Sequence, residues 1–105
     1  MEHYTKYNPD MVKIKKKAAI NKLDEASNYI NKSKRRILKI KLDKIETLKQ
    51  SLDKPQYTMV DFIEMKTIND SLLSFFKTRG EIGDIWAEYL VAYLDYKLTM
   101  MPLYK

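Results

Sequence analysis

The chain of 105 residues contains no cysteine and a single histidine, His3. Without cysteine it has no disulfide, no thiolate nucleophile and no cysteine ligand for a metal. Without a second histidine it also lacks the nucleophile–base pairs that many hydrolytic enzymes use. The sequence therefore predicts a protein that is not an enzyme and that needs no cofactor, no metal and no small-molecule substrate.

Long apolar runs are missing as well. The longest nearly apolar window, residues 85–94, is ten residues long and contains Glu88, whereas a membrane-spanning helix needs about 20 apolar residues. The first ten residues carry charged side chains and no apolar run, so they do not resemble a secretory signal. Residues 1–8 are expected to be extended or disordered. We therefore expect a soluble protein, at most peripheral to a membrane, in the cytoplasm or another reducing intracellular compartment.

Glycine and proline are scarce, with two and three residues, too few for a sheet protein with frequent turns. Hydrophobic residues make up 45% and charged residues 32% of the chain, which is typical of a single helical domain. Residues 1–54 carry 15 Lys and Arg against 7 acidic residues, whereas residues 55–105 carry 5 against 7. Most aromatic residues lie in the second segment. The composition predicts an all-α helical bundle with a basic first half and an apolar second half.

The first predicted helix begins at Asn8-Pro9-Asp10, because Asn can cap a helix, proline suits its first position and Asp favours its positive end. No breaker follows until Pro55. At 100° per residue, one arc of apolar residues keeps its phase across the polar stretch 31–36. The pattern favours one helix over residues 9–53, roughly 65 Å long, with a kink near residues 31–34 as the alternative. The arc consists of Val12, Ala19, Leu23, Ala26, Ile30, Ile37, Ile45, Leu48 and Leu52.

Two further helices are predicted in the second half of the chain. Thr58 and Asp61 resemble a capping box at the start of a helix over residues 58–78, and Gly80 is its expected stop. A helix over residues 81–100 follows. The short link between these two helices predicts an antiparallel hairpin about 30 Å long.

This hairpin is shorter than the apolar stripe of the first helix, so it cannot cover the whole stripe. The remainder can be covered by a second copy of the chain, by another protein, or by a break that folds the first helix into a four-helix bundle. We expect a homo-oligomer or a subunit of a complex rather than a free monomer.

Two groups of cations on the first helix are candidates for binding a polyanion, because lysine acts as a point charge toward phosphate. Only three arginines are present, so base-specific recognition is not favoured. The alternative interpretation is a solvated helix face. The candidate residues are Lys13, Lys15, Lys16, Lys17, Lys32, Lys34, Arg35, Arg36, Lys39 and Lys41.

Lys34 and Lys41 point into the predicted apolar stripe, seven residues apart. Glu88 and Asp95 have the same spacing on the last predicted helix. One hypothesis pairs Lys34 with Asp95 and Lys41 with Glu88 across an antiparallel contact. We favour the simpler interpretation, in which the two carboxylates face solvent and the lysines extend their ammonium groups to water.

A set of large side chains on the last helix has two interpretations. Core packing is the default for aromatic residues at helical spacing. The alternative is an anchor surface for another protein, since Trp and Tyr concentrate at the centres of interfaces. The candidate interface residues are Trp86, Tyr89, Tyr93, Tyr96 and Met100.

From these patterns we expect a non-enzymatic interaction protein, namely an adaptor, an inhibitor or a subunit of a larger assembly. Its second half would bind protein, and its basic first half would face an acidic partner or nucleic acid. The alternative function is non-specific nucleic-acid binding by the lysine-rich helix.

Overall fold

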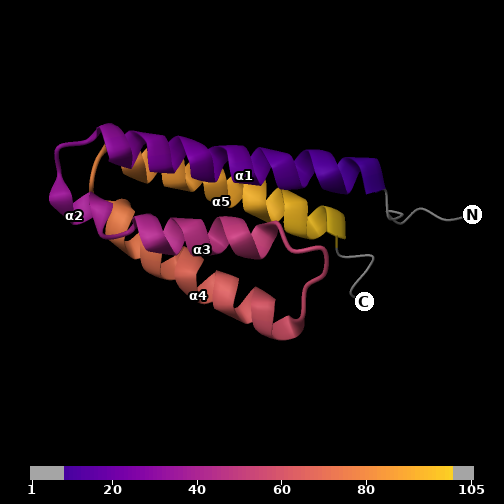
Figure 1. The fold of residues 1–105 in the computed structure, drawn as a ribbon. Helices are drawn as coiled ribbons and strands as arrows, with labels where there is room; N and C mark the ends of the chain where they lie inside the picture. The colour runs from indigo at the N-terminus through magenta and orange to yellow at the C-terminus, as the bar shows by residue number, and fades with distance from the viewer. Residues whose placement is uncertain (1–8, 101–105) are drawn as a thin grey trace, which may run out of the picture.

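The computed structural model describes residues 9–100, which fold into a helical bundle (Figure 1). The elements are α1 (Pro9–Lys32), α2 (Arg36–Lys39), α3 (Leu42–Leu52), α4 (Met59–Phe76) and α5 (Glu81–Met100). α1 and α5 pack along each other over most of their lengths, and α3 and α4 complete the bundle. The predicted all-α bundle is confirmed. The expectation for residues 1–8 lies outside the described residues.

The prediction of one continuous helix over residues 9–53 is wrong, because the chain leaves the helix after Lys32 and reverses its direction. α2 makes a single turn at the end of the bundle, and α3 then runs back along α1 (Figure 1). Asp24 of α1 and Lys49 of α3 form an ion pair with 2.5 Å between the carboxylate and the ammonium group. Of the three ways to cover the apolar stripe, the structure shows the third: a break folds the first predicted helix back on itself within a four-helix bundle.

The reversal has a local cause in the polar stretch that follows α1. The hydroxyl oxygen of Ser33 accepts a hydrogen bond from the backbone N–H of Arg35 at 3.1 Å. Such a side-chain bond offers the backbone an alternative to the helical ladder. The apolar pattern also slips by one residue here, since Leu38 is fully buried whereas Ile37 is 45% exposed.

The apolar stripe of the first two long helices is covered from within the chain. Its buried members are Ala19, Leu23, Ala26, Ile30, Ile45, Leu48 and Leu52, all of which have no exposed surface. They pack into one core with buried side chains of α4 and α5. The geometric reason for expecting an obligatory second copy or partner therefore no longer applies.

Two ion pairs join α1 to α5 in an antiparallel arrangement. The ammonium group of Lys15 lies 2.7 Å from the Asp95 carboxylate, and that of Lys22 lies 2.9 Å from the Glu88 carboxylate. Both the lysines and the carboxylates are seven residues apart, which is two helical turns. The pKa of Lys22 is raised, first by its hydrogen bond to Glu88 and then by its hydrogen bond to Glu25.

The hypothesis that assigned these two carboxylates to Lys34 and Lys41 is wrong. Because the first helix breaks after Lys32, both lysines lie at the end of the bundle, beyond the α1–α5 contact. Lys34 is exposed, and the Lys41 ammonium group lies over the ring of Phe75, 4.6 Å from its centroid. The antiparallel docking and the seven-residue spacing belonged to that hypothesis, which was not the favoured one. The favoured interpretation holds only in part, because the Glu88 and Asp95 side chains are more than half exposed but both are paired with lysines.

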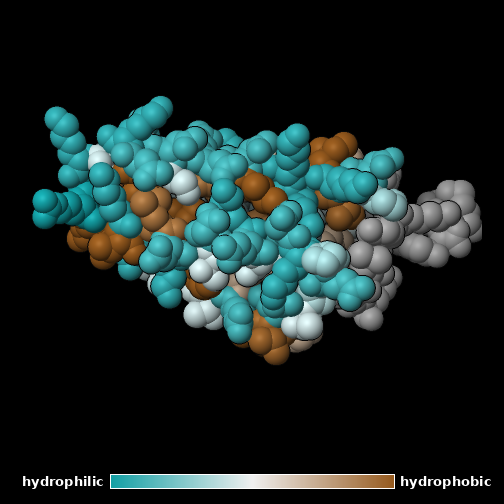
Figure 2. All heavy atoms as spheres, in the orientation of Figure 1, coloured by the Kyte–Doolittle hydropathy of each residue, from teal (hydrophilic) through white to brown (hydrophobic). Residues whose placement is uncertain are grey.

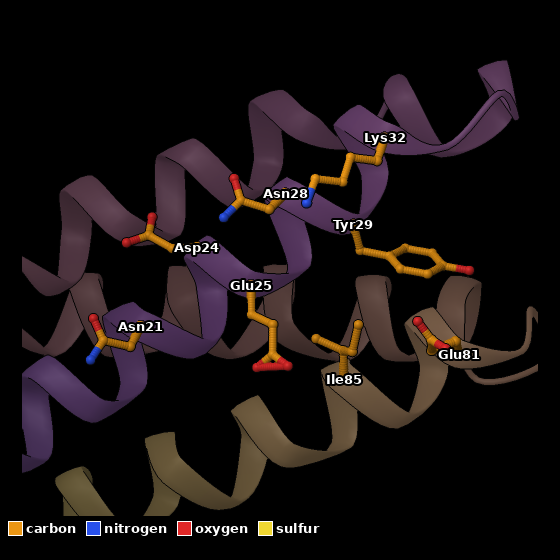
Figure 3. A pocket seen from close by; sticks show the side chains of 8 residues that line it. All are labelled: Asn21, Asp24, Glu25, Asn28, Tyr29, Lys32, Glu81 and Ile85. Carbon is orange, nitrogen blue, oxygen red and sulfur yellow. The ribbon is translucent and has the colours of Figure 1, made fainter.

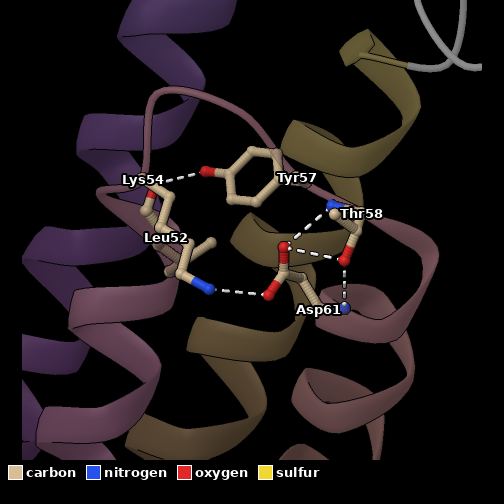
Figure 4. A network of polar contacts seen from close by, with 5 residues as sticks. All are labelled: Leu52, Lys54, Tyr57, Thr58 and Asp61. Atoms are coloured by element: carbon tan, nitrogen blue, oxygen red, sulfur yellow. Dashed lines mark hydrogen bonds and ion pairs between the residues drawn. The ribbon is translucent and has the colours of Figure 1, made fainter.

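The predicted capping box at the start of α4 is confirmed (Figure 4). The Asp61 carboxylate accepts a hydrogen bond from the Thr58 backbone N–H at 2.8 Å, and the Thr58 hydroxyl accepts one from the Asp61 N–H at 3.2 Å. Lys54 donates a further hydrogen bond to Asp61 at 2.7 Å. This bond, followed by the bond from the Thr58 backbone, lowers the pKa of Asp61. The Tyr57 hydroxyl donates to the carbonyl of Leu52 and so satisfies the end of α3.

Two glycines shape the connection between α4 and α5. Gly80 has a φ of +79°, the left-handed conformation that glycine adopts without strain. Gly83 has a different role, because a Cβ at this position would lie 2.7 Å from the backbone oxygen of Phe76. The missing side chain lets α5 begin directly against the end of α4. The helices predicted over residues 58–78 and 81–100 agree with α4 and α5 within two residues.

Candidate functional site

The reversal after α1 gathers cationic side chains at one end of the bundle. α2 lies next to the turn between α4 and α5 (Figure 1), and the Arg35 guanidinium donates a hydrogen bond to the Arg79 carbonyl in that turn at 3.3 Å. We call this surface the basic end. It is defined by Lys32, Lys34, Arg35, Arg36, Lys39, Lys41, Lys77 and Arg79.

None of these eight cations forms an ion pair within residues 9–100. Six of them are exposed, and Lys41 and Arg79 are half-buried. Elsewhere in the bundle the ion-paired lysines are Lys15, Lys22, Lys49, Lys54 and Lys66. Lys13, Lys16, Lys17, Lys44 and Lys97 also form no ion pair among the described residues, but the basic end holds most of the unpaired cations and can attract an anionic partner.

An aromatic ring holds the two half-buried cations of the basic end. The guanidinium carbon of Arg79 lies 3.9 Å from the Phe75 ring centroid, and the Lys41 ammonium lies 4.6 Å from it. Arg79 also donates a hydrogen bond to the Phe75 carbonyl. Cation–π contacts favour both cations without neutralising them. Sequence reasoning did not include Lys77 and Arg79 in the site, because it did not bring the α4–α5 turn beside α2.

Two exposed isoleucines lie among these cations. Ile37 is 45% exposed and Ile40 is 66% exposed. Figure 2 shows hydrophobic atoms next to projecting hydrophilic side chains at the end of the bundle where α2 lies. Large apolar side chains beside unpaired cations are typical of a surface that buries them against a partner.

The other predicted lysine cluster is separate from the basic end, about 25 Å away along α1. Lys15 pairs with Asp95. Lys16 donates to the Lys54 carbonyl at 3.3 Å. Lys13 and Lys17 are exposed. The structure therefore does not join the ten predicted cations into one surface, and half of the first cluster makes contacts within the fold.

The candidate interface residues of α5 are core residues rather than surface residues. Trp86 and Tyr89 have no exposed surface, and the other members of the set are at most 5% exposed. The core interpretation is therefore the one that the structure shows for Trp86, Tyr89, Tyr93, Tyr96 and Met100. The exposed apolar residues of α5 lie on its other side and are Val91, Leu94 and Leu98.

One buried polar residue, Asn69 of α4, is bonded to these aromatics. Its side-chain oxygen accepts a hydrogen bond from the Tyr89 hydroxyl at 2.9 Å, and its carbonyl accepts one from the Trp86 indole at 3.4 Å. Burial raises the pKa of Tyr89 well above the usual range and also raises the pKa of Tyr93. Both hydroxyls therefore stay protonated at physiological pH.

An open groove of about 640 Å³ lies between α1 and the start of α5 (Figure 3). Two of its carboxylates are already paired, Asp24 with Lys49 at 2.5 Å and Glu25 with Lys22 at 3.2 Å. Its lining consists of Asn21, Asp24, Glu25, Asn28, Tyr29, Lys32, Glu81 and Ile85. This set contains no nucleophile–base pair of the kind discussed above.

Within the part of the chain that the structure describes, no cluster of acidic or histidine side chains could hold a metal ion. In the same residues, no helix combines the length and the apolar character needed to cross a membrane. No known protein family, curated protein or solved structure significantly matches this chain. The function must therefore be inferred from the surface itself.

Proposed function

We propose that this protein is a non-enzymatic interaction module that binds an acidic surface of another protein through its basic end. The observation that carries the proposal is the gathering of eight cations, without ion pairs among residues 9–100, around two exposed isoleucines. The cations accelerate the encounter with an acidic partner and set its orientation. The isoleucines add affinity because their apolar surface is removed from water when the complex forms.

Two features favour a protein partner over nucleic acid. Ile37 and Ile40 are stabilised only against apolar surface, which a phosphate backbone does not offer. In addition, Arg79 is held against Phe75, so few guanidinium groups remain for the bidentate contact with guanine that specific readout commonly uses.

Non-specific nucleic-acid binding is the second candidate function. It is favoured by the five exposed cations that lie within eight residues of sequence, which are Lys32, Lys34, Arg35, Arg36 and Lys39. Lysine-rich surfaces bind phosphate backbones mainly by releasing counterions, without reading the bases.

A matched pair of charge reversals tests the proposal. Lys34→Glu/Arg36→Glu changes two exposed cations of the basic end, and Lys13→Glu/Lys17→Glu makes the same charge change on α1. Each protein is used as bait in nuclease-treated lysate of the source cells. We expect an acidic protein that binds the wild type and the α1 variant but is lost with the basic-end variant. Equal loss with both variants would mean that net charge, not the basic end, determines binding.

Fluorescence anisotropy with a duplex DNA probe at two salt concentrations tests the second candidate. Contact with about five phosphates predicts a logarithmic salt slope near −4.5. Ile37→Ser/Ile40→Ser separates the two functions, because it should weaken binding to the acidic protein and leave DNA binding unchanged. Strong DNA binding that is insensitive to these isoleucines, with no protein captured, would favour the second candidate.

A further inference from the structure

A pocket of about 220 Å³ lies between α4 and α5, in the middle of this helix pair. Its lining consists of Lys66, Asn69, Asp70, Leu90, Tyr93, Leu94 and Lys97. Pockets for small-molecule ligands usually enclose about 300–1,000 Å³. This one has the size for a single side chain of a partner rather than for a whole ligand.

The Tyr93 side chain, which lines this pocket, is only 5% exposed. Its hydroxyl has no hydrogen-bond partner among the described residues. The neighbouring Tyr89 hydroxyl, in contrast, donates to the side chain of Asn69. A buried hydroxyl without a partner is unfavourable, and native proteins usually provide one. The hydroxyl oxygen is itself buried, so a group in the pocket reaches it only when neighbouring side chains move aside.

The charge around the pocket favours a carboxylate as the missing partner. Lys66 pairs with Asp70 at 2.6 Å, whereas Lys97 forms no ion pair within residues 9–100. The Lys97 ammonium group lies over the Phe62 ring, 5.7 Å from its centroid. Lys66 and Lys97 outweigh Asp70 by one charge in the lining. Because Asp70 is already paired with Lys66, an entering carboxylate can pair with Lys97 and accept a hydrogen bond from Tyr93.

Exposed apolar side chains flank the pocket on both helices. Leu94 lines it, and Val91 and Leu98 lie one turn before and one turn after Leu94 on α5. On α4, Ile63 lies one turn before Lys66. These apolar residues are each more than half exposed. Two antiparallel helices with apolar rims form the kind of groove that binds a third, amphipathic helix.

We infer that the α4–α5 groove binds an amphipathic helix of another protein that carries one Asp or Glu in its apolar face. The apolar side chains of that helix pack on Leu94, Leu98 and Ile63. Its carboxylate enters the pocket, accepts a hydrogen bond from Tyr93 and lies near Lys97. This inference is independent of the proposed function of the basic end, since the groove and the basic end share no residue. A protein that binds one partner at each surface would act as an adaptor.

A phage-displayed library of short helical peptides with a randomised apolar face tests this inference on the full-length protein. Selected peptides should share one Asp or Glu within an otherwise apolar face. Leu94→Asp should abolish their binding, and Ile14→Asp, which changes an equally exposed apolar residue on α1, should not. Enrichment of peptides without a shared carboxylate, or binding that survives Leu94→Asp, would overturn the inference.

The contact with Tyr93 is tested by a double-mutant cycle. Tyr93→Phe should weaken binding of the best acidic peptide by at least about tenfold. Its effect should be much smaller on a matched peptide in which Leu or Met replaces the acidic residue, because that peptide has no acceptor for the hydroxyl. The free Tyr93→Phe variant should melt at the same temperature as the wild type or higher, because an unpartnered buried hydroxyl is removed. This separates a binding role from a structural one. Equal weakening of both peptides would overturn the role of Tyr93.

Self-association through the same groove is the competing outcome. If light scattering shows a dimer of the wild-type chain that Leu94→Asp dissociates, the groove belongs to a second copy and the inferred partner helix is wrong. A monomer at the same concentrations agrees with the inference. Neither result changes the test of the basic end, because Lys34→Glu/Arg36→Glu leaves the groove intact.

Discussion

Lys15 of α1 and Asp95 of α5 form an ion pair at 2.7 Å, two turns along the helices from the pair of Lys22 with Glu88. The two pairs set the same antiparallel register. A shift of one helix by a single turn would separate both pairs at once. The register of the most extensive helix contact in the bundle is therefore specified by charge as well as by apolar packing.

A double-mutant cycle on Lys15 and Asp95 tests this statement. Lys15→Glu should lower the free energy of unfolding, and adding Asp95→Lys should recover part of the loss because the pair is restored in reverse. Partly exposed pairs couple by about 0.2–1 kcal/mol, which urea denaturation of the four proteins can resolve. Lys34 is the residue that the incorrect hypothesis paired with Asp95, so Lys34→Glu should show no coupling with Asp95→Lys. A coupling of Lys34 as large as that of Lys15 would contradict the observed register.

Asp61 makes stability depend on acid pH. Its pKa is lowered in the folded chain, first by Lys54 and then by the Thr58 backbone N–H. A lowered folded-state pKa contributes stability above the pKa of the unfolded chain, about 3.9, and this contribution is lost as the pH falls through the folded-state pKa. At pH 7, Asp61→Asn should therefore melt below the wild type.

The same variant should approach the wild type in melting temperature when both are measured well below pH 4. The Asp61 carboxyl can also be titrated directly by NMR. Lys54→Met should move its pKa back toward the ordinary value, because the largest cause of the shift is removed. A melting-temperature difference that does not change with pH would show that the charge of Asp61 does not contribute to stability.

Two glycine substitutions should differ in their cost. Gly83→Ala places a methyl group 2.7 Å from the Phe76 carbonyl oxygen, so backbone must move. We expect a loss of about 1–3 kcal/mol in the free energy of unfolding. In Gly80→Ala the added Cβ lies within 4 Å of no other atom, but the alanine must keep a φ of +79°. This strained backbone conformation should lower the free energy of unfolding by about 1 kcal/mol. Chemical denaturation of the two variants should rank Gly83→Ala as the more damaging. The reverse order would mean that α5 begins further from α4 than the structure shows.

Two tyrosines on the same helix should respond differently to the loss of the hydroxyl. Tyr89→Phe leaves the buried side-chain oxygen of Asn69 without its donor, which should cost about 1–3 kcal/mol. Tyr93→Phe removes a buried hydroxyl without a partner among the described residues, so it should leave stability unchanged or raise it. Thermal melts at pH 7 compare the two directly. A large loss for Tyr93→Phe would reveal a bond that the free protein already makes.

The second half of the fold was predictable because its signals are local. Thr58 with Asp61 marks the start of α4, and Gly80 marks the turn after it. Each of these signals depends on residues within one helical turn. The bounds of α4 and α5 therefore agree with the prediction within two residues.

The break after α1 was not predictable from apolar periodicity. At 100° per residue, the buried residues of α1 and α3 fall on one arc although a reversal of the chain separates the two helices. The only displaced position is at the turn, where Leu38 is buried in place of Ile37. A phase that survives a break cannot reveal it. The hydrogen bond from the Arg35 N–H to Ser33 was the local sign, but many serines make such bonds without ending a helix.

The candidate site depended on that break. Sequence reasoning found the cations from Lys32 to Lys41 but assigned them to the middle of a rod. Folding back places them at an end, beside Lys77 and Arg79. The partner lysines of Glu88 and Asp95 were missed for the same reason, since the rod put the wrong turns of the first helix opposite α5.

The pairing of α1 with α5 also has a consequence for biosynthesis. The first of these helices emerges from the ribosome long before the last, because more than 60 residues separate Lys22 from Glu88. Until α5 arrives, Leu23, Ala26 and Ile30 lack the helix that covers much of their surface. A nascent chain that stops before Glu81 therefore exposes apolar side chains of α1 and should be prone to aggregation.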